Sequence, residues 1–258
     1  METFGDVDLP VMIGEQAQLW ELILALADRL APSQWSLIGG QMVSLYAIHA
    51  DVEWPRVTRD VDMLANMEVL HSNLASCTTA LEELGLRAQP DSNGAAYRFS
   101  KTAPSNPGAL IVDLLAPDHR KPNTRLRTSG GPTIEIAGGT QALQRTGTFN
   151  VRTTDGRQAQ VPVPNLLGAI VLKAAAWAAD TRDRQRHAQD VALLTSLIDD
   201  PGALVLSFAG SDRKRLLKLR ETLDERTAQE WLLLGPERSE LGRDNWTELT
   251  NTTRPRSR

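Results

Sequence analysis

Apolar and polar side chains along the first 160 residues follow helical and strand-like patterns in turn. Between Glu15 and Leu30 the apolar side chains recur at helical spacing, which predicts an amphipathic helix. The apolar run Trp35–Ile38 predicts a short buried strand that leads into Gly39-Gly40. The same reasoning predicts helices over 41–50 and 68–84, strands over 58–64, 86–89, 96–100 and 109–115, and a hairpin over 149–163.

Beyond Pro162 and Pro164 the pattern becomes wholly helical. Helices are predicted over 166–179 and 190–198, a long charged segment covers 211–234, and the polar residues from 237 onward are expected to fray. Because the strands do not alternate regularly with helices, a doubly wound parallel sheet is not expected. We predict an α+β (mixed α/β) chain with two domains: residues 1–160 form a mixed sheet flanked by helices, and residues 161–258 form a helical bundle.

Composition and charge narrow the class of protein. The chain has 258 residues, of which 41% are hydrophobic and 23% charged, as is ordinary for a soluble globular protein. Its single cysteine, Cys77, excludes an internal disulfide, and its net charge of −4 means that any contact with nucleic acid must use a local patch. No apolar run reaches the roughly 18 residues that span a bilayer. The acidic N-terminus lacks the features of a signal peptide, so we expect a cytoplasmic protein with no membrane partner.

Three aspartates on predicted strands form the candidate chemical site. Asp60 and Asp62 are two residues apart on one strand and therefore project from the same face, while Asp113 interrupts the most apolar strand of the chain. If the two strands are neighbours, the three carboxylates form one cluster, and three hard oxygen ligands on rigid strands suit Mg²⁺. The alternatives are that the Asp60–Asp62 pair is a solvated strand edge and that Asp113 caps a turn with Asp118.

The Gly39-Gly40 pair lies between the buried strand and the helix that follows it. Two residues without Cβ atoms let the backbone approach a ligand closely, and the N–H groups at the start of the helix would point toward a triphosphate. In nucleotidyl transfer, two divalent ions stabilise the attacking and leaving oxygens. The glycine pair and the acidic cluster together therefore predict phosphate chemistry.

Leu37-Ile38-Gly39-Gly40, followed by the strand Thr58-Arg59-Asp60-Val61-Asp62-Met63, resembles the signature of the DNA polymerase β-like nucleotidyltransferase superfamily. Asp113, in Ile111-Val112-Asp113-Leu114, matches the third carboxylate of that family. The resemblance implies that residues 1–160 are a nucleotidyltransferase core. It also implies that Asp60 and Asp62 hold two metal ions and that Asp113 completes the ion that activates the nucleophile, with a second role as base.

The segments Pro164–Ala174 and Arg184–Val191 resemble the AbiEii-type toxins of bacterial toxin–antitoxin and abortive-infection systems, which include the mycobacterial MenT toxins. The resemblance covers residues 34 to 198, and Lys173 and Asp190 are the matching positions. It implies that Lys173 contacts the triphosphate and that Asp190 orients Lys173 or Arg186, or contacts the nucleotide. The family often has a lysine immediately before this aspartate, whereas this chain has Gln189. The alternatives are a surface lysine at 173 and, at 190, a helix N-terminal acid.

The function that the resemblance implies is a metal-dependent nucleotidyltransferase toxin. It would transfer a nucleoside monophosphate from an NTP to RNA, with the tRNA 3′ end as first choice, using Mg²⁺ or alternatively Mn²⁺, and a cognate antitoxin would neutralise it. Other hypotheses are transfer to an aminoglycoside-like small molecule or a protein hydroxyl, and a non-catalytic nucleotide-binding module. The candidate catalytic residues are Asp60, Asp62, Asp113, Lys173 and Asp190, and the candidate nucleotide-binding residues are Gly39, Gly40, Thr58, Lys173 and Arg186.

Two further positions have alternative readings. Some MenT-type toxins are silenced by phosphorylation of a hydroxyl residue beside the acidic motif, which makes Thr58 a candidate, although a β-branched residue is also ordinary on a strand. The basic stretch 211–220 could hold an RNA backbone or could be a solvated face offset by the acids that follow it.

Overall fold

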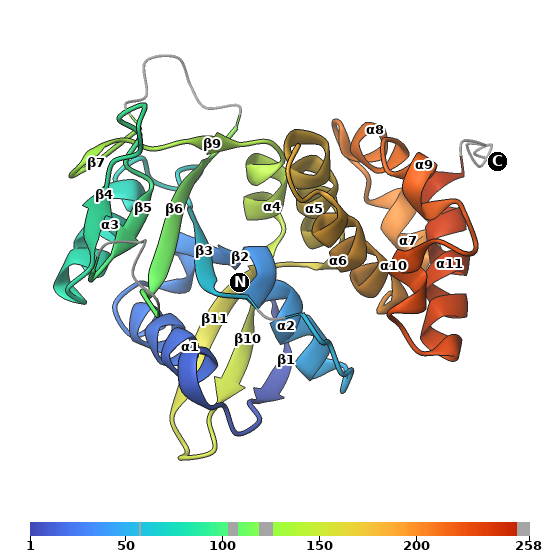
Figure 1. Ribbon diagram of the computed structural model, residues 1–258, viewed down its shortest axis with the longest axis horizontal. Helices are drawn as coiled ribbons and strands as arrows, with labels where there is room; N and C mark the ends of the chain where they lie inside the picture. The colour runs from blue at the N-terminus through green and yellow to red at the C-terminus, as the bar shows by residue number, and fades with distance from the viewer. Residues whose placement is uncertain (57, 103–107, 119–125, 252–258) are drawn as a thin grey trace. The chain divides into compact units, whose positions relative to one another are not determined.

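The computed structural model describes residues 1–56, 58–102, 108–118 and 126–251. The chain divides into two compact units, Met1–Gly168 and Ala169–Arg258. The structure divides the chain after residue 168, whereas the sequence pattern predicted a boundary after residue 160. The first unit contains mixed sheets and helices, and the regular structure described in the second is helical, which confirms the α+β class (Figure 1).

The larger sheet of the first unit is mixed and six-stranded. Its strands follow the order β2-β3-β6-β5-β4, and β9 also pairs with β6. β3 and β6 are parallel neighbours, whereas β2 is antiparallel to β3 and β5 is antiparallel to β6. This pairing places the two acid-bearing strands side by side. The bounds are β2 Trp35–Ile38, β3 Asp60–Ala65, β4 Arg87–Gln89, β5 Arg98–Ser100, β6 Ile111–Pro117 and β9 Glu135–Ile136.

A second, three-stranded sheet contains the predicted hairpin. β10 (Thr146–Arg152) and β11 (Gln158–Pro164) pair antiparallel, as the sequence pattern indicates. The N-terminal strand β1 (Thr3–Asp8) adds to β10 in parallel and was not predicted. Only Val7 of this strand is buried, so its sequence lacks the apolar alternation that normally marks a strand.

The helices of the first unit pack their apolar faces against these sheets. α1 (Gly14–Ala27) buries Leu19, Ile23 and Leu26, which belong to the apolar residues at helical spacing from which this helix was predicted. α2 (Gly39–His49) contacts β1 and β3, and the Tyr46 hydroxyl on this helix donates a 2.7 Å hydrogen bond to the Pro164 carbonyl. The other elements are the 3₁₀ helix Pro32–Gln34, α3 Asn73–Glu83, α4 Gly139–Gln144 and the short strands β7 Arg127–Thr128 and β8 Gly131–Pro132.

Three details of the first unit differ from the sequence predictions. α3 begins at Asn73 rather than at residue 68. The β7–β8 pair lies in the segment 118–132, where no strand was predicted, and residues 119–125 of that segment lie outside the described residues. Asp118 caps α4, because its carboxylate accepts hydrogen bonds from the backbone N–H groups of Gly138 (2.8 Å) and Thr140 (3.0 Å). Asp113 lies within the strand β6, so the alternative in which it caps a turn with Asp118 is wrong.

In the second unit, α6 and α11 pack together and α10 contacts both. The segment from 237 was expected to fray, but it forms the 15-residue helix α11 (Pro236–Thr250). Although its sequence is polar, one face of this helix is buried and includes Trp246 and Asn245. The side-chain amide of Asn245 donates hydrogen bonds to the Thr195 and Ile198 carbonyls. The other helices are α5 Leu166–Ala179, α6 Gln185–Ser196, α7 Pro201–Leu206, α8 Asp212–Leu217, α9 Arg220–Leu223 and α10 Gln229–Leu232.

Among the described residues, the helices are all too short or too polar to cross a bilayer.

Candidate metal and nucleotide site

The parallel pairing of β3 with β6 brings the three predicted aspartates together. Asp62 lies directly opposite Asp113 in the strand register, and Asp60 and Asp62 are half-buried on the face opposite the buried Val61 and Met63. Each of the three carboxylates offers one oxygen, and these oxygens all lie within 4.8 Å of one another. The acidic cluster predicted from the sequence is therefore present.

This cluster fits a divalent cation on chemical grounds. Three carboxylates so close together repel one another unless a positive charge lies between or beside them. Carboxylate oxygens are the ligands that Mg²⁺ and Mn²⁺ prefer, and strands hold them at fixed positions. Asp60, Asp62 and Asp113 are thus the residues that could hold a metal, and their role as ligands stays a prediction.

Arg98 is a member of the site that the sequence analysis missed. It lies on β5, directly opposite Asp113 on the side away from Asp62, so that the three residues form one row across neighbouring strands. Its Nε donates to Asp113 Oδ1 (2.8 Å) and its Nη2 to Asp113 Oδ2 (2.7 Å). Such a two-point bond fixes the orientation of the carboxylate as well as its charge.

The pKa of Asp113 is raised, because the effect of burial on this carboxyl outweighs that of its hydrogen bond to Arg98. Burial raises the pKa of the Asp113 carboxyl, the Arg98 bond lowers it, and the charge of Asp60 raises it further. The pKa of Arg98 is raised, first by its hydrogen bond to Asp113. Arg98 therefore offsets part of the cost of ionising a buried acid beside a second acid.

Gly39 makes room for Asp62. β2 pairs with β3 so that Ile38 lies opposite Asp62, and α2 begins at the next residue, Gly39. A Cβ atom on Gly39 would lie 1.8 Å from Asp62 Oδ2, and the φ of +70° at this position disfavours any side chain. The helix start can therefore approach the acidic cluster only because residue 39 is glycine.

Gly40 makes room for Thr58 in the same way. A Cβ on Gly40 would lie 1.9 Å from Thr58 Oγ1, and Thr58 itself is buried. Gln16 on α1 holds this segment, because its Nε2 donates to the Thr58 carbonyl at 2.6 Å. The Thr58 hydroxyl thus lies against the start of α2, where a phosphate would need the surrounding residues to move. Its modification stays a hypothesis.

Lys173 and Asp190 form a buried ion pair within the second unit. Lys173 Nζ lies 2.7 Å from Asp190 Oδ2, and their side chains are 4% and 0% exposed. The reading of Lys173 as a surface lysine is therefore wrong. Asp190 lies in the interior of α6 rather than in its first turn, so the helix N-terminal reading of Asp190 is wrong as well.

Arg186 belongs to a second cluster, organised by Asp180. The Asp180 carboxylate accepts from the backbone N–H groups of Arg182 and Asp183, and it lies 3.1 Å from Arg186 Nη2 and 3.3 Å from His187 Nε2. Burial, with the positive charges of Lys173 and Arg186, lowers the pKa of His187 to about 4. Arg186 itself stays half exposed, so its guanidinium remains accessible to solvent.

Comparisons with known proteins do not assign this chain to a family. No protein-family model matches the sequence, and no curated protein matches it. Among solved structures, the crystal structure of an antigenic nucleotidyltransferase-like protein from Paracoccidioides brasiliensis is similar. It has a TM-score of 0.48 and 13% sequence identity, and the match covers 80% of this chain and 89% of that chain.

Proposed function

We propose that this protein is a metal-dependent nucleotidyltransferase that transfers a nucleoside monophosphate from an NTP to RNA, with the tRNA 3′ end as the acceptor. The observation that supports the proposal most is the convergence of Asp60, Asp62 and Asp113 beside the glycine start of α2. The resemblance of these segments to nucleotidyltransferase toxins supports a role in blocking translation, under the control of a cognate antitoxin.

Each part of the site has a distinct task in this proposal. Divalent ions held by the three aspartates would supply Lewis-acid stabilisation of the reacting phosphate. The backbone N–H groups at the start of α2 would bind triphosphate oxygens, because the first N–H groups of a helix lack intrahelical partners. Gly39 and Gly40 keep that approach free of side chains, and Arg98 holds Asp113 in a fixed orientation.

The chemical step is a displacement at the α-phosphorus of the NTP. The acceptor ribose hydroxyl oxygen forms the new bond to phosphorus, the bond from phosphorus to the bridging oxygen breaks, and pyrophosphate leaves with that oxygen. The hydroxyl proton passes to a carboxylate of the cluster. Asp113 is the proposed acceptor, a role that the resemblance to nucleotidyltransferases implies.

Lys173, Asp190 and Arg186 belong to the proposal on the strength of the resemblance alone. In the structure the Lys173 charge is neutralised by Asp190, so a direct contact with the triphosphate requires that pair to open. Arg186 keeps one half-exposed guanidinium that could contact a phosphate while it remains bonded to Asp180.

Labelled-NTP transfer tests the proposed function. The wild-type protein is incubated with each α-labelled NTP, Mg²⁺, and purified tRNA, total protein or an aminoglycoside, and Asp60→Asn serves as the control. The proposal expects label in tRNA that depends on Asp60. Label confined to the small molecule or to protein would replace RNA as the acceptor, and the absence of label in every fraction would leave a nucleotide-binding module.

A further inference from the structure

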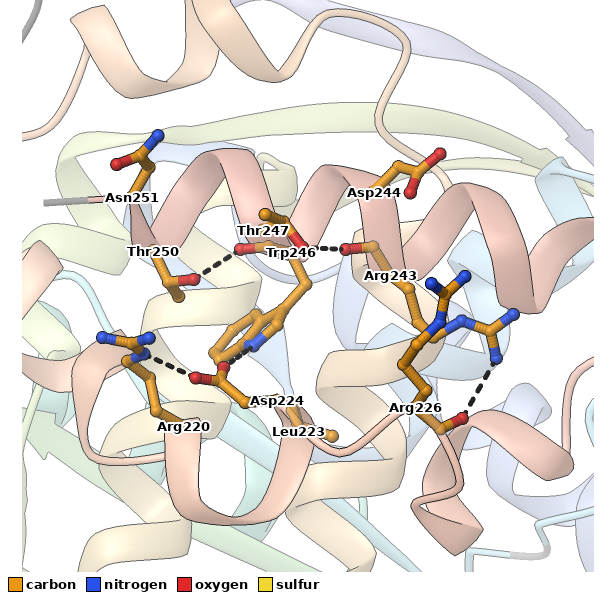
Figure 2. A pocket seen from close by; sticks show the side chains of 10 residues that line it. All are labelled: Arg220, Leu223, Asp224, Arg226, Arg243, Asp244, Trp246, Thr247, Thr250 and Asn251. Atoms are coloured by element: carbon orange, nitrogen blue, oxygen red, sulfur yellow. Dashed lines mark hydrogen bonds and ion pairs between the residues drawn. The ribbon is translucent and has the colours of Figure 1, made fainter. Parts of the chain in front are cut away.

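The helical unit contains a cavity of about 460 Å³ that belongs to neither of the clusters described above. It lies between α9, the segment that follows α9, and the C-terminal half of α11 (Figure 2). Three arginines contribute to its wall, Arg220, Arg226 and Arg243, together with the acids Asp224 and Asp244. The ligand that the cavity could bind depends on which of these charged side chains already form ion pairs.

On one wall of the cavity, the charges of Arg220 and Asp224 are already paired with each other. Arg220 Nε donates to Asp224 Oδ2 at 2.7 Å, and the indole Nε1 of the buried Trp246 donates to Asp224 Oδ1 at 2.9 Å. Both oxygens of Asp224 are therefore engaged (Figure 2). This acid is consequently not available to neutralise the other two arginines.

The opposite wall carries the side chains of Arg226 and Arg243 (Figure 2). Arg243 Nη1 donates to Ser239 Oγ (2.8 Å) and to the Arg226 carbonyl (3.3 Å), which are both neutral acceptors. Within the described ranges neither guanidinium forms an ion pair, and the buried Arg243 Nε has no hydrogen-bond partner. Asp244 also lines the cavity, but no ion pair joins it to either arginine. Two cations that form no ion pair, one of them with an unsatisfied buried donor, favour an anionic ligand.

Two further cations in this unit form no ion pair. Lys214 on α8 and Lys218 just after it are exposed, and neither makes an ion pair with any residue that the structure describes. A single small anion would be bound by the two arginines alone, whereas a polynucleotide presents a phosphate at every nucleotide and could also contact Lys214 and Lys218.

We propose that Arg226 and Arg243 bind a backbone phosphate of the RNA acceptor, so that the α9–α11 cavity is an acceptor-docking site. The guanidinium fork matches the oxygens of a phosphodiester, and contacts of this kind hold RNA in position without reading its sequence. The inference rests on the proposed function for the identity of the acceptor, and the recognition chemistry comes from the cavity itself.

Binding measured without catalysis tests the proposal. Full-length protein carrying Asp62→Asn is titrated into fluorescein-labelled single-stranded RNA at several salt concentrations, and anisotropy reports the affinity. Arg226→Gln and Arg243→Lys are compared with Arg182→Gln, an exposed arginine of the same unit that does not line the cavity. Arg226 is exposed, so its replacement does not disturb packing, and Arg243→Lys keeps the charge while removing the fork.

We expect Arg226→Gln to weaken RNA binding by about 3–10-fold at low salt and to reduce the salt slope by about 0.7, the value for one phosphate contact on a single strand. Arg243→Lys should weaken binding and Arg182→Gln should change it less than about twofold. Equal affinities in all three variants would overturn the docking site. Arg226-dependent binding of free ATP that RNA does not displace would overturn it as well, by making the cavity a nucleotide site.

This experiment and the transfer assay fail in different ways. If wild-type protein transfers no label to tRNA while RNA binding still depends on Arg226, the proposed function is wrong and the cavity remains an RNA-binding site without an acceptor role. If label is transferred but neither cavity variant alters RNA affinity, the docking site is wrong and the proposed function stands.

Discussion

Two charge clusters of this protein, the three aspartates and the Lys173–Asp190 pair, differ in their exposure and in their balance of charge. In the first unit, three carboxylates lie within 4.8 Å of one another, and Asp60 and Asp62 are half-exposed, with Arg98 bonded to Asp113. In the second unit, one lysine and one aspartate form a pair that is almost completely buried. The first cluster has more negative than positive charge, and the second is balanced.

This difference separates a ligand site from a structural element. A surplus of like charge near solvent costs stability and is relieved when a counter-ion binds. The charges of a buried ion pair already neutralise each other, so such a pair attracts a charged ligand only weakly. Loss of one partner leaves a buried charge unpaired and lowers the free energy of unfolding. We therefore expect changes in the acidic cluster to affect activity and changes in the Lys173–Asp190 pair to affect stability.

Asp62→Asn should have the largest effect on activity. Loss of one ligand charge should lower nucleotidyl transfer by about 10³–10⁴-fold, because metal stabilisation of the transition state is worth several kcal/mol. The free energy of unfolding should change by no more than about 1 kcal/mol, because Asp62 is half-exposed and water screens its interactions. Labelled-NTP transfer and urea unfolding measure the two quantities. A large loss of stability would show that the cluster is structural.

Asp190→Ala should have the opposite profile. It leaves the Lys173 ammonium buried without its partner, so we expect the free energy of unfolding to fall by about 3–5 kcal/mol. The double change Lys173→Met with Asp190→Leu should recover most of that loss, because it removes both charges. Full transfer activity in the double variant would mean that Lys173 does not bind the triphosphate.

Gly39→Ala probes the contact between the helix start and the acidic cluster. The new Cβ would collide with Asp62 Oδ2, so we expect about 1–3 kcal/mol of destabilisation together with reduced transfer. Gly94→Ala is the matched control, because Gly94 has a similar φ of +78° but no atom within 4 Å of the added Cβ. Equal effects of the two changes on transfer would show that the close approach to Asp62 has no functional role.

His187 should give the smallest effect, a pH dependence of stability. Burial, with nearby Lys173 and Arg186, lowers its pKa to about 4 in the folded state, below its ordinary value of 6.5. The unfolded state therefore binds the proton more readily, so stability is complete above pH 6.5 and declines as the pH falls toward 4. We expect up to about 2 kcal/mol, since solvent screens part of the interaction. The decline should be weaker in His187→Gln, and an unchanged decline would assign it to other groups.

The sequence predicted the parts of the site that depend on local pattern. The alternation of Asp60 and Asp62 with Val61 and Met63 indicated one acidic face, and the isolated Asp113 on an apolar strand indicated a buried charge in need of partners. The predicted cluster also required the two strands to be neighbours. The structure supplies that pairing, in a register that sequence spacing does not determine.

Arg98 and α11 show what local pattern could not predict. Arg98 lies on a three-residue strand, and its pairing with Asp113 depends entirely on how β5 aligns with β6. α11 appeared polar because its buried face uses Asn245 and Trp246, whose polar groups are satisfied by Thr195, Ile198 and Asp224 from other segments. Such tertiary hydrogen bonds leave no periodic apolar signal in the sequence.

Titration with Mn²⁺, followed by electron paramagnetic resonance, tests the central claim most directly. The wild-type protein should bind Mn²⁺, and Asp62→Asn should weaken that binding by more than about tenfold. Glu68→Gln, which removes an exposed acid of the same unit, should leave it unchanged. Equal Mn²⁺ affinity in the wild type and Asp62→Asn, or no binding to the wild type, would contradict a metal site at the three aspartates.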